Sequence, residues 1–232
     1  MRVLELFCGN KSIGKLCIQL GWESISLDFE KKYNPTHLAN ILDWDYKQYP
    51  KNHFDIVWAS PPCTEYSLLQ YSWYGRKKNG IIFTQELHEE AMKNADKIVL
   101  RTFEIINYFD KCEEWFVENP GGGGQMGKRD IMKGIPFYDV DYCMYSDWGY
   151  RKRTRIWTNK KDFHNLCCDG ECGNVVKYID EKGKQRCLHK TNLGNSGRQI
   201  RANKVNVKIY NGLSIEERYR IPEDLVFSLF LM

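Results

Sequence analysis

The residues with the clearest chemical potential surround Cys63, which follows two consecutive prolines in the segment SPPCTEYS. Residues 54–59 (FDIVWA), just before it, are typical of a buried strand. Proline fixes its own φ and restricts the residue before it, so the two prolines present the cysteine in a constrained loop after that strand. A reactive thiol needs such a polar, accessible position, whereas an inert cysteine prefers apolar burial. Cys63 is therefore a candidate nucleophile, with an inert loop cysteine as the alternative.

Charged side chains follow two other strand-like segments. Glu118 follows residues 114–117 (EWFV), where a low-dielectric cleft would keep a carboxyl protonated or make it a strong hydrogen-bond partner. Arg153 and Arg155 share one face of the segment RKRTRIW because side chains alternate along a strand. Paired arginines can orient an anion or a carbonyl oxygen. The alternative for Glu118 is an ordinary surface acid, and the alternative for the two arginines is a solvated edge strand.

A glycine-containing turn, CGNKSIG, follows the first strand-like segment at 2–8 and opens a short helix for which Ser12 is a candidate N-cap. Nucleotide-like cofactors use this context, although the glycine spacing matches neither the dinucleotide fingerprint nor a P-loop. Asp28 ends the next strand-like segment, 23–28 (ESISLD), where an acid can accept hydrogen bonds from ribose hydroxyls. Together these features predict an adenosine-type cofactor.

The elements that must position these side chains alternate between strand and helix, the longest helical pattern running from about 85 to 109. Such alternation predicts an α/β fold, a doubly wound Rossmann-like parallel sheet with ligands at the carboxyl ends of its strands. The alternation stops after Thr158. We therefore expect a catalytic domain at 1–160 and a small basic region with Cys and His residues and a C-terminal helix at 161–232.

Charge is divided unevenly along the chain. Up to Tyr150 there are 17 Lys and Arg against 21 Asp and Glu, a net −4, and beyond it 17 against 9, a net +8. A basic C-terminal third predicts contact with a polyanion, and an ordinary solvated surface is the alternative. The candidate phosphate contacts are Arg198, Arg201 and Lys204.

The chain has nine cysteines, an odd number, and no segment that looks like an export signal or a membrane span. We therefore expect reduced thiols in a soluble intracellular protein. Several cysteines gather near a histidine after residue 160, and they predict a structural zinc site, with unligated loop cysteines as the alternative. The candidate ligands are Cys167, Cys168, Cys172, Cys187 and His189, with His164 as another imidazole.

The segments ELFCGNKSIG, SLDFE, SPPCTEYS, VENP and RKRTRIW together resemble the motif series of the cytosine-5 DNA methyltransferases, in the family's order, over roughly residues 1–158. The amino-acid sequences of these motifs are similar to those of compact members encoded by bacteriophages and large DNA viruses. The resemblance implies transfer of a methyl group from S-adenosylmethionine to C5 of a cytosine flipped out of double-stranded DNA. For a viral protein, it also implies the host cytoplasm, nucleus or viral factory as the location.

The resemblance also implies roles for individual residues. Cys63 would attack C6 of the ring, Glu118 would hold N3 and the exocyclic amine, and Arg153 and Arg155 would brace the base carbonyl and the active loop. The predicted cofactor-binding residues are Phe7, Cys8, Gly9, Ser12, Ile13, Asp28, Phe29, Asn40, Ile41 and Pro61.

Some positions depart from the family pattern. Asn40 stands where the family has an Asp for the adenine amine, and its amide oxygen can still accept that hydrogen bond. Arg151 replaces a Gln. The final segment does not match the family motif that completes the cofactor pocket, and little length remains for target recognition. These departures leave two alternatives: a catalytically impaired nucleic-acid-binding protein, or a cytosine-5 methyltransferase that acts on tRNA.

Overall fold

The chain forms two compact units. A computed structural model describes residues 1–122, 124–180, 182–191, 199–202, 205–208 and 213–231. Unit 1 consists of Met1–Tyr138 and Arg155–Asp162, and unit 2 consists of Asp139–Thr154 and Phe163–Met232. The segment 139–154 thus belongs with the C-terminal part, and the domain boundary expected near residue 160 stays a prediction.

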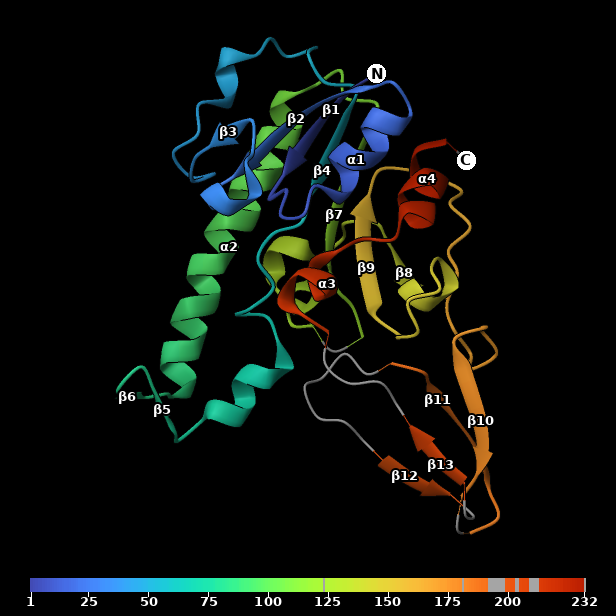
Figure 1. The fold of residues 1–232 in the computed structure, drawn as a ribbon. Helices are drawn as coiled ribbons and strands as arrows, with labels where there is room; N and C mark the ends of the chain where they lie inside the picture. The colour runs from blue at the N-terminus through green and yellow to red at the C-terminus, as the bar shows by residue number, and fades with distance from the viewer. Residues whose placement is uncertain (123, 181, 192–198, 203–204, 209–212, 232) are drawn as a thin grey trace. The chain divides into compact units, whose positions relative to one another are not determined.

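A seven-stranded sheet forms the framework of the fold, in the order β3-β2-β1-β4-β7-β9-β8 (Figure 1). The first five strands in this order pair in parallel. The chain starts in the middle of the sheet and winds in both directions from there, so the predicted doubly wound α/β fold is confirmed. The strands are β1 (Arg2–Leu6), β2 (Glu23–Asp28), β3 (His37–Leu38), β4 (Ile56–Ala59), β7 (Glu114–Pro120), β8 (Phe137–Asp141) and β9 (Arg153–Thr158).

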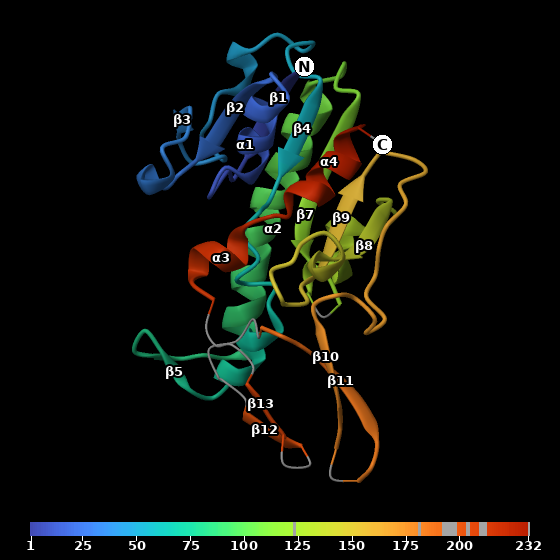
Figure 2. The same ribbon diagram turned by 45° about the vertical axis from the view of Figure 1, so that its right-hand side comes forward.

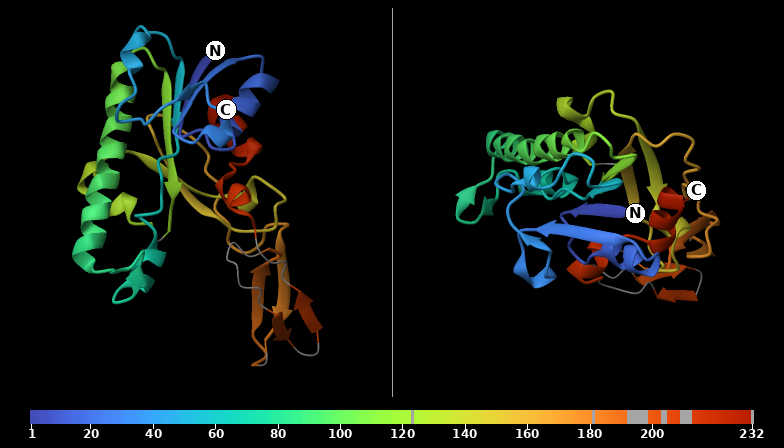
Figure 3. Two further views of the ribbon diagram at one scale, coloured as in Figure 1. Left: turned by 60° about the vertical axis from the view of Figure 1, so that its left-hand side comes forward. Right: turned by 90° about the horizontal axis from the view of Figure 1, so that it is seen from above.

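Two helices cover the parallel strands of unit 1, α1 (Ser12–Gln19) on one face and α2 (Gln85–Tyr108) on the other (Figure 3). The hydroxyl of Thr84 accepts a hydrogen bond from the amide of Leu87 and so caps α2. Ser12 was expected to cap α1, but it is the first helical residue and Lys11 takes the cap position. Among the helices that the described residues form, none is long and apolar enough to cross a membrane.

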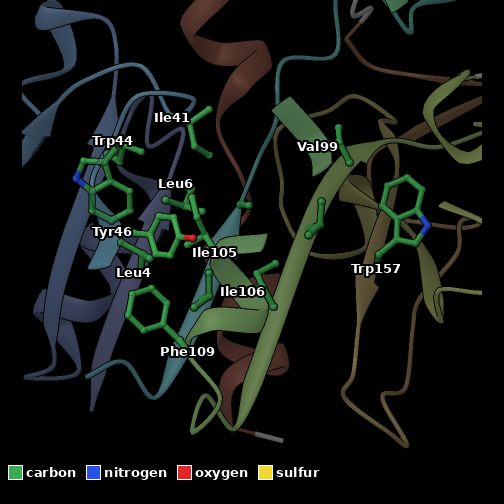
Figure 4. Packing of buried hydrophobic residues seen from close by; sticks show 14 of the residues in the cluster. Leu4, Leu6, Ile41, Trp44, Tyr46, Val99, Ile105, Ile106, Phe109 and Trp157 are labelled. Atoms are coloured by element: carbon green, nitrogen blue, oxygen red, sulfur yellow. The ribbon is translucent and has the colours of Figure 1, made fainter. Parts of the chain in front are cut away.

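The core of unit 1 lies between the sheet and α2 (Figure 4). Ile105 and Ile106 of α2 belong to one buried cluster with Leu4 of β1 and Val57 of β4, and all four are at most 4% exposed. Burial of each such side chain stabilises the fold by roughly 1.5–3 kcal/mol. This packing fixes where the strands end, and therefore where the loops that carry the candidate site begin.

Short elements shape the loops of unit 1. Most belong to the two long loops that follow β4 and β7. They are η1 (Lys31–Tyr33), η2 (Tyr46–Gln48), η3 (Leu68–Trp73), β5 (Lys77–Lys78), β6 (Ile81–Ile82), η4 (Met126–Lys128) and η5 (Asp130–Met132).

The described residues of unit 2 include two antiparallel hairpins, a 3-10 turn and two helices. The longer hairpin pairs β10 (Val175–Ile179) with β11 (Gln185–His189) in a twisted ribbon (Figure 2). The other elements are η6 (Tyr142–Met144), β12 (Gln199–Ala202), β13 (Val205–Lys208), α3 (Ile215–Tyr219) and α4 (Glu223–Leu231).

Most of the predicted phosphate contacts cannot be placed. Arg198 and Lys204 lie outside the described residues, and Arg201 is described only as a backbone position in β12. Their contact with a polyanion stays a prediction.

Candidate active site

The loop that carries Cys63 follows β4, and the acid Glu118 lies near the end of the neighbouring strand β7. β4 and β7 pair in parallel with Ala59 opposite Val117, so the two strands deliver the next residues to the same edge of the sheet. The side-chain amide of Asn119 donates a hydrogen bond to the carbonyl oxygen of Pro61 at 2.8 Å, and this amide side chain is 1% exposed. The bond joins the two motifs, which the sequence could only place separately at strand ends.

Cys63 is half-buried, and the chain turns immediately after it. The amide of Tyr66 donates to the carbonyl oxygen of Cys63 at 3.1 Å. The hydroxyl of Tyr66 in turn donates to Asp96 on α2 at 2.9 Å, and Arg129 pairs with the same carboxylate at 2.6 Å. Burial, reinforced by Asp96, raises the pKa of Tyr66 well above its ordinary value, so this hydroxyl stays a donor. The turn after Cys63 is thereby anchored to the long helix.

A second polar anchor lies on the same helix. The imidazole of His88 is fully buried, with Nε2 2.8 Å from the carbonyl oxygen of Glu65 and Nδ1 2.8 Å from the hydroxyl of Tyr74. The sequence analysis missed His88, Asp96 and Arg129. A signal existed for the two helical residues, because His88 and Asp96 are polar residues on a mainly apolar face of the helix.

A hollow beside β1 and β2 collects many of the predicted cofactor residues. Its lining includes Pro62, the neighbour of Cys63, so the hollow extends to the nucleophile loop. Pro62, rather than the predicted Pro61, faces this space. The lining residues are Phe7, Leu27, Asp28, Phe29, Ala39, Asn40, Ile41, Pro62 and Ile98.

Asp28 and Phe29 offer different chemistry to this hollow. The carboxylate of Asp28 accepts the amide of Gly9 at 3.0 Å through one oxygen and the amide of Glu30 at 2.9 Å through the other. Each oxygen keeps a second lone pair, which can accept from a ribose hydroxyl. Phe29 is 65% exposed, and such a ring provides a flat apolar face for a purine. Asn40 accepts the amide of Leu42 through its side-chain oxygen at 3.1 Å.

A larger hollow lies on the other side of the glycine turn, lined by Glu5, Gly9, Gly14 and residues of β2 among others. Glu5 accepts the amides of Ile13 at 3.2 Å and Gly14 at 3.0 Å. Burial raises the pKa of Glu5 to about 7, although these two donors act in the opposite direction. The first turn of α1 is therefore held by a buried carboxyl that its position in the sequence did not single out.

Three predicted cofactor residues occupy different places. Cys8, Ser12 and Ile13 line neither of the two hollows, and the side chains of Cys8 and Ile13 are buried. Burial raises the pKa of the Cys8 thiol to about 12, so this thiol does not compete as a nucleophile. Ile13 contributes its amide to Glu5 instead. A direct contact of these three with a cofactor remains only a prediction.

The two predicted arginines have separate partners. Arg155 belongs to unit 1 with Cys63, and its guanidinium lies 3.7 Å from the ring centroid of Phe137. Arg153 belongs to unit 2 and donates to both oxygens of Asp141, at 2.8 and 2.6 Å.

Arg151, which stands where the family has Gln, donates to Asp141 as well, at 3.0 Å. Burial alone would raise the pKa of Asp141, but the hydrogen bonds from Arg153 and Arg151 hold it below its ordinary value. The paired arginines are thus not equivalent, because Arg153 is committed to a buried carboxylate.

Comparison with known proteins gives one curated relative, a probable DNA (cytosine-5)-methyltransferase of Frog virus 3 (isolate Goorha). It is 35% identical over 234 residues, which cover 99% of this chain and 98% of the relative. This chain belongs to the DNA (cytosine-5) methyltransferase family. The predicted family resemblance and the enzyme class are thereby confirmed, and the viral origin of the relative agrees with the predicted viral type. No family model matches the chain.

Solved structures of methyltransferases are also similar to this enzyme. The Schizosaccharomyces pombe Dnmt2 methyltransferase has a TM-score of 0.46 at 13% identity, over 72% of this chain and 52% of its own. A SAM-dependent methyltransferase from Archaeoglobus fulgidus has a TM-score of 0.39 at 11% identity, over 68% and 86%. This chain spans about half the length of the Dnmt2 chain.

Unit 2 of the methyltransferase contains a group of Cys and His side chains, here called the Cys/His cluster. Its four donor atoms all lie within 4.8 Å of one another. The members are Cys143, Cys168, Cys172 and His189.

The cluster differs from the predicted ligand set, because Cys143 belongs to it and Cys167 and Cys187 do not, and metal binding by any of these residues stays a prediction. Cys167 is exposed, and its thiol donates to the carbonyl oxygen of Asp139. Cys187 is exposed and precedes His189 by two residues in β11, about 6.6 Å along a strand. The nine cysteines all lie among the described residues, and no disulfide joins any two of them.

Proposed function

We propose that this enzyme methylates C5 of cytosine in double-stranded DNA, with Cys63 forming a covalent bond to C6 of a flipped base. The observation that carries the proposal is the buried hydrogen bond from Asn119 to Pro61, which holds the nucleophile loop beside Glu118. A nucleophile and an acid at one edge of the sheet, next to a hollow with an adenosine-binding character, are the parts that this reaction needs.

The chemistry explains why a thiol is needed. Cytosine C5 is a weak nucleophile until the Cys63 thiolate adds to C6 and its electron pair passes into the ring, which makes C5 electron-rich. S-adenosylmethionine, when bound, would supply an electrophilic methyl group for C5 and would leave as the thioether S-adenosylhomocysteine. Loss of the proton from C5 then allows the C6–S bond to break, which regenerates the thiolate and the aromatic ring.

Glu118 and Arg155 would support the charge changes in the ring. Glu118 is 7% exposed, and a carboxyl shielded in this way can hold N3 and the exocyclic amine of the base. Arg155, the arginine that shares unit 1 with Cys63, would bind the base carbonyl oxygen. Arg153, bound to Asp141, would act by bracing the chain around that arginine.

The cofactor would occupy the hollow that ends at Pro62. Asp28 would accept the ribose hydroxyls, Phe29 would stack on the adenine, and Asn40 would contact the adenine amine. The lining residues fit an adenosine group because they combine a shielded carboxylate with an open aromatic face.

The loop after Cys63 has the composition of a DNA-contacting surface. It exposes apolar side chains, with Leu69 at 76% and Tyr71 and Trp73 at 43% each, next to the basic pair Arg76 and Lys77. Base flipping costs a few kcal/mol, which contacts of the flipped base and of the duplex must offset. Exposed rings and cations provide such contacts.

Removal of the thiol tests the mechanism. Cys63→Ala should abolish methyl transfer while the affinities for S-adenosylmethionine and DNA stay within a few-fold of wild type, because only the covalent step needs the thiolate. Cys167→Ala, which removes an exposed thiol outside the site, is the control and should retain activity. Turnover by the Cys63 variant would refute the nucleophile assignment.

A second assay traps the adduct itself. In duplex DNA that contains 5-fluorocytosine, fluorine replaces the C5 proton that must leave, so the wild-type enzyme should form an SDS-resistant complex with the DNA. The same assay with tRNA tests the other substrate class. Methylation of ordinary DNA without a trapped complex would contradict the covalent route.

A further inference from the structure

We propose that the Cys/His cluster binds one structural zinc ion that holds unit 2 together. The cluster joins three separate segments of this unit: the turn η6, the loop before β10, and the end of β11. The reaction proposed above uses none of these side chains. The ligands are Cys143, Cys168, Cys172 and His189.

The distances within the cluster match tetrahedral zinc. With Zn–S near 2.3 Å and Zn–N near 2.05 Å, a tetrahedral ion sets each sulfur about 3.6 Å from the ligating nitrogen. Nε2 of His189 lies 3.7 Å from Sγ of Cys168 and 3.4 Å from Sγ of Cys172. Both of these sulfur–nitrogen distances thus suit one ion, and all four donor atoms lie within 4.8 Å of one another.

The backbone around the cluster is arranged to support thiolates. The amide of Gly170 donates to Sγ of Cys168 at 3.4 Å, and such a bond stabilises negative charge on a metal-bound sulfur. Gly170 has φ of 102°, in the region that favours glycine, so the turn that aims this amide depends on the residue type. The amide of Cys168 donates to buried Asp141 at 2.8 Å, which fixes the position of this ligand.

The segment that carries Cys143 is fixed independently. The side-chain amide of Asn174, which is 6% exposed, donates to the carbonyl oxygens of Cys143 at 3.0 Å and Ser146 at 2.8 Å. Its oxygen accepts the amide of Gly149 at 3.1 Å. Supporting hydrogen bonds that hold the ligand segments in place are a regular feature of built metal sites.

The composition of this region explains why a metal would be needed. Among the described residues from 163 to 191, the buried hydrophobic side chains are only those of Phe163 and Cys168. Such limited burial cannot offset the conformational entropy lost in ordering the segment, and a metal bound only by the folded chain supplies the missing stabilisation. Three thiols and an imidazole fill all four positions of a tetrahedral zinc, so the ion would hold no reactive water and would be structural.

Metal analysis of the full-length protein, purified without chelator, tests the site. Wild type should contain about one zinc per chain, and the substitutions Cys143→Ser and Cys172→Ser should each lower that content sharply. Cys167→Ser and Cys187→Ser are matched controls, because both remove exposed thiols from the same unit but outside the cluster, and both should retain zinc. Loss of zinc in the controls but not in the cluster variants would overturn the ligand set.

A second measurement uses only wild-type protein, so it tests the metal site even if the cluster variants fail to fold. Cobalt(II) added to chelator-treated wild type should give the intense visible bands of a tetrahedral site and thiolate-to-cobalt charge-transfer absorption, and stoichiometric zinc should abolish both. Zinc removal should also lower the melting temperature and expose the β10–β11 hairpin to protease. A metal-free chain that binds neither ion under reducing conditions would refute the proposal, as would a native disulfide among the cluster cysteines.

Discussion

Asn119→Ala should weaken catalysis far more than it weakens folding. The substitution removes the donor that lies 2.8 Å from the carbonyl oxygen of Pro61, at a site that is 1% exposed. A buried carbonyl left without a donor costs about 1–3 kcal/mol. The side-chain oxygen of Asn119 has no hydrogen-bond partner among the described residues, and its removal offsets part of that cost. The net loss in the free energy of unfolding should therefore be about 1 kcal/mol.

The catalytic effect follows from the position of the bond. Pro61 precedes Cys63 by two residues, so a released carbonyl lets the nucleophile loop shift relative to Glu118. Misplacement of a reacting group by about 1 Å costs on the order of 10²-fold in rate. We expect kcat for methyl transfer to fall by about that factor, with the dissociation constant for S-adenosylmethionine nearly unchanged because Asp28 and Phe29 are untouched.

Asn159→Ala is the matched control. The side chain of Asn159 accepts the amide of Trp115 at 2.9 Å and donates to the carbonyl oxygen of Glu113 at 3.1 Å, at the opposite end of β7 from Asn119. Asn159 is exposed and water can replace its bonds, so its loss should cost no more than about 1 kcal/mol and leave kcat unchanged. Urea unfolding and single-turnover methylation of both variants separate the two effects. Equal kcat values for the two variants would show that the Asn119 bond is merely structural.

Two other perturbations follow from the buried polar groups of unit 1. The pKa of Glu5 is raised from 4.5 to about 7, so the folded state binds the proton of this carboxyl more tightly than the unfolded state does. The protein therefore loses stability as the pH rises from about 4.5 through 7. The loss is about 3 kcal/mol, at 1.36 kcal/mol per pKa unit. Glu5→Gln should flatten that part of the stability profile in urea unfolding at a series of pH values, and a profile with the wild-type slope would contradict the assignment. Asp96→Asn should cost about 2 kcal/mol and lower kcat, because Asp96 links Tyr66 to Arg129 at a site 13% exposed. Glu89→Gln, which breaks the more exposed pair of the same arginine, should cost under about 1 kcal/mol, and thermal melts that rank the two variants in the opposite order would refute this account.

Much of the fold and part of the site could be predicted from the sequence because their signals are local. Apolar runs and helical periodicity predicted β1, β2, β4, β7 and α2, since each pattern reflects burial of one short segment. The residues that follow those strands, Cys63 and Glu118 among them, were therefore expected at one edge of the sheet. The ordered motifs also identified the family, which the Frog virus 3 relative confirms.

The tertiary structure decided what depends on contacts between distant segments. The bond from Asn119 to Pro61 joins residues 58 apart, and the anchor from His88 to Glu65 joins residues 23 apart. Neither leaves a local pattern, because each needs only one polar atom at the right place in the folded chain.

The Cys/His cluster and the arginine pair show most clearly that contacts between distant segments cannot be predicted from local sequence patterns. Spacing favoured Cys167 and Cys187 as ligands, yet Cys143 takes part because η6 folds back onto the loop before β10. Alternation along β9 placed Arg153 and Arg155 on one face, but only the structure shows that Asp141 holds the first of them. The sequence shows which side chains can donate a hydrogen bond, accept one or bind a metal. The partner of each side chain depends on which buried polar groups lie close together in the folded chain.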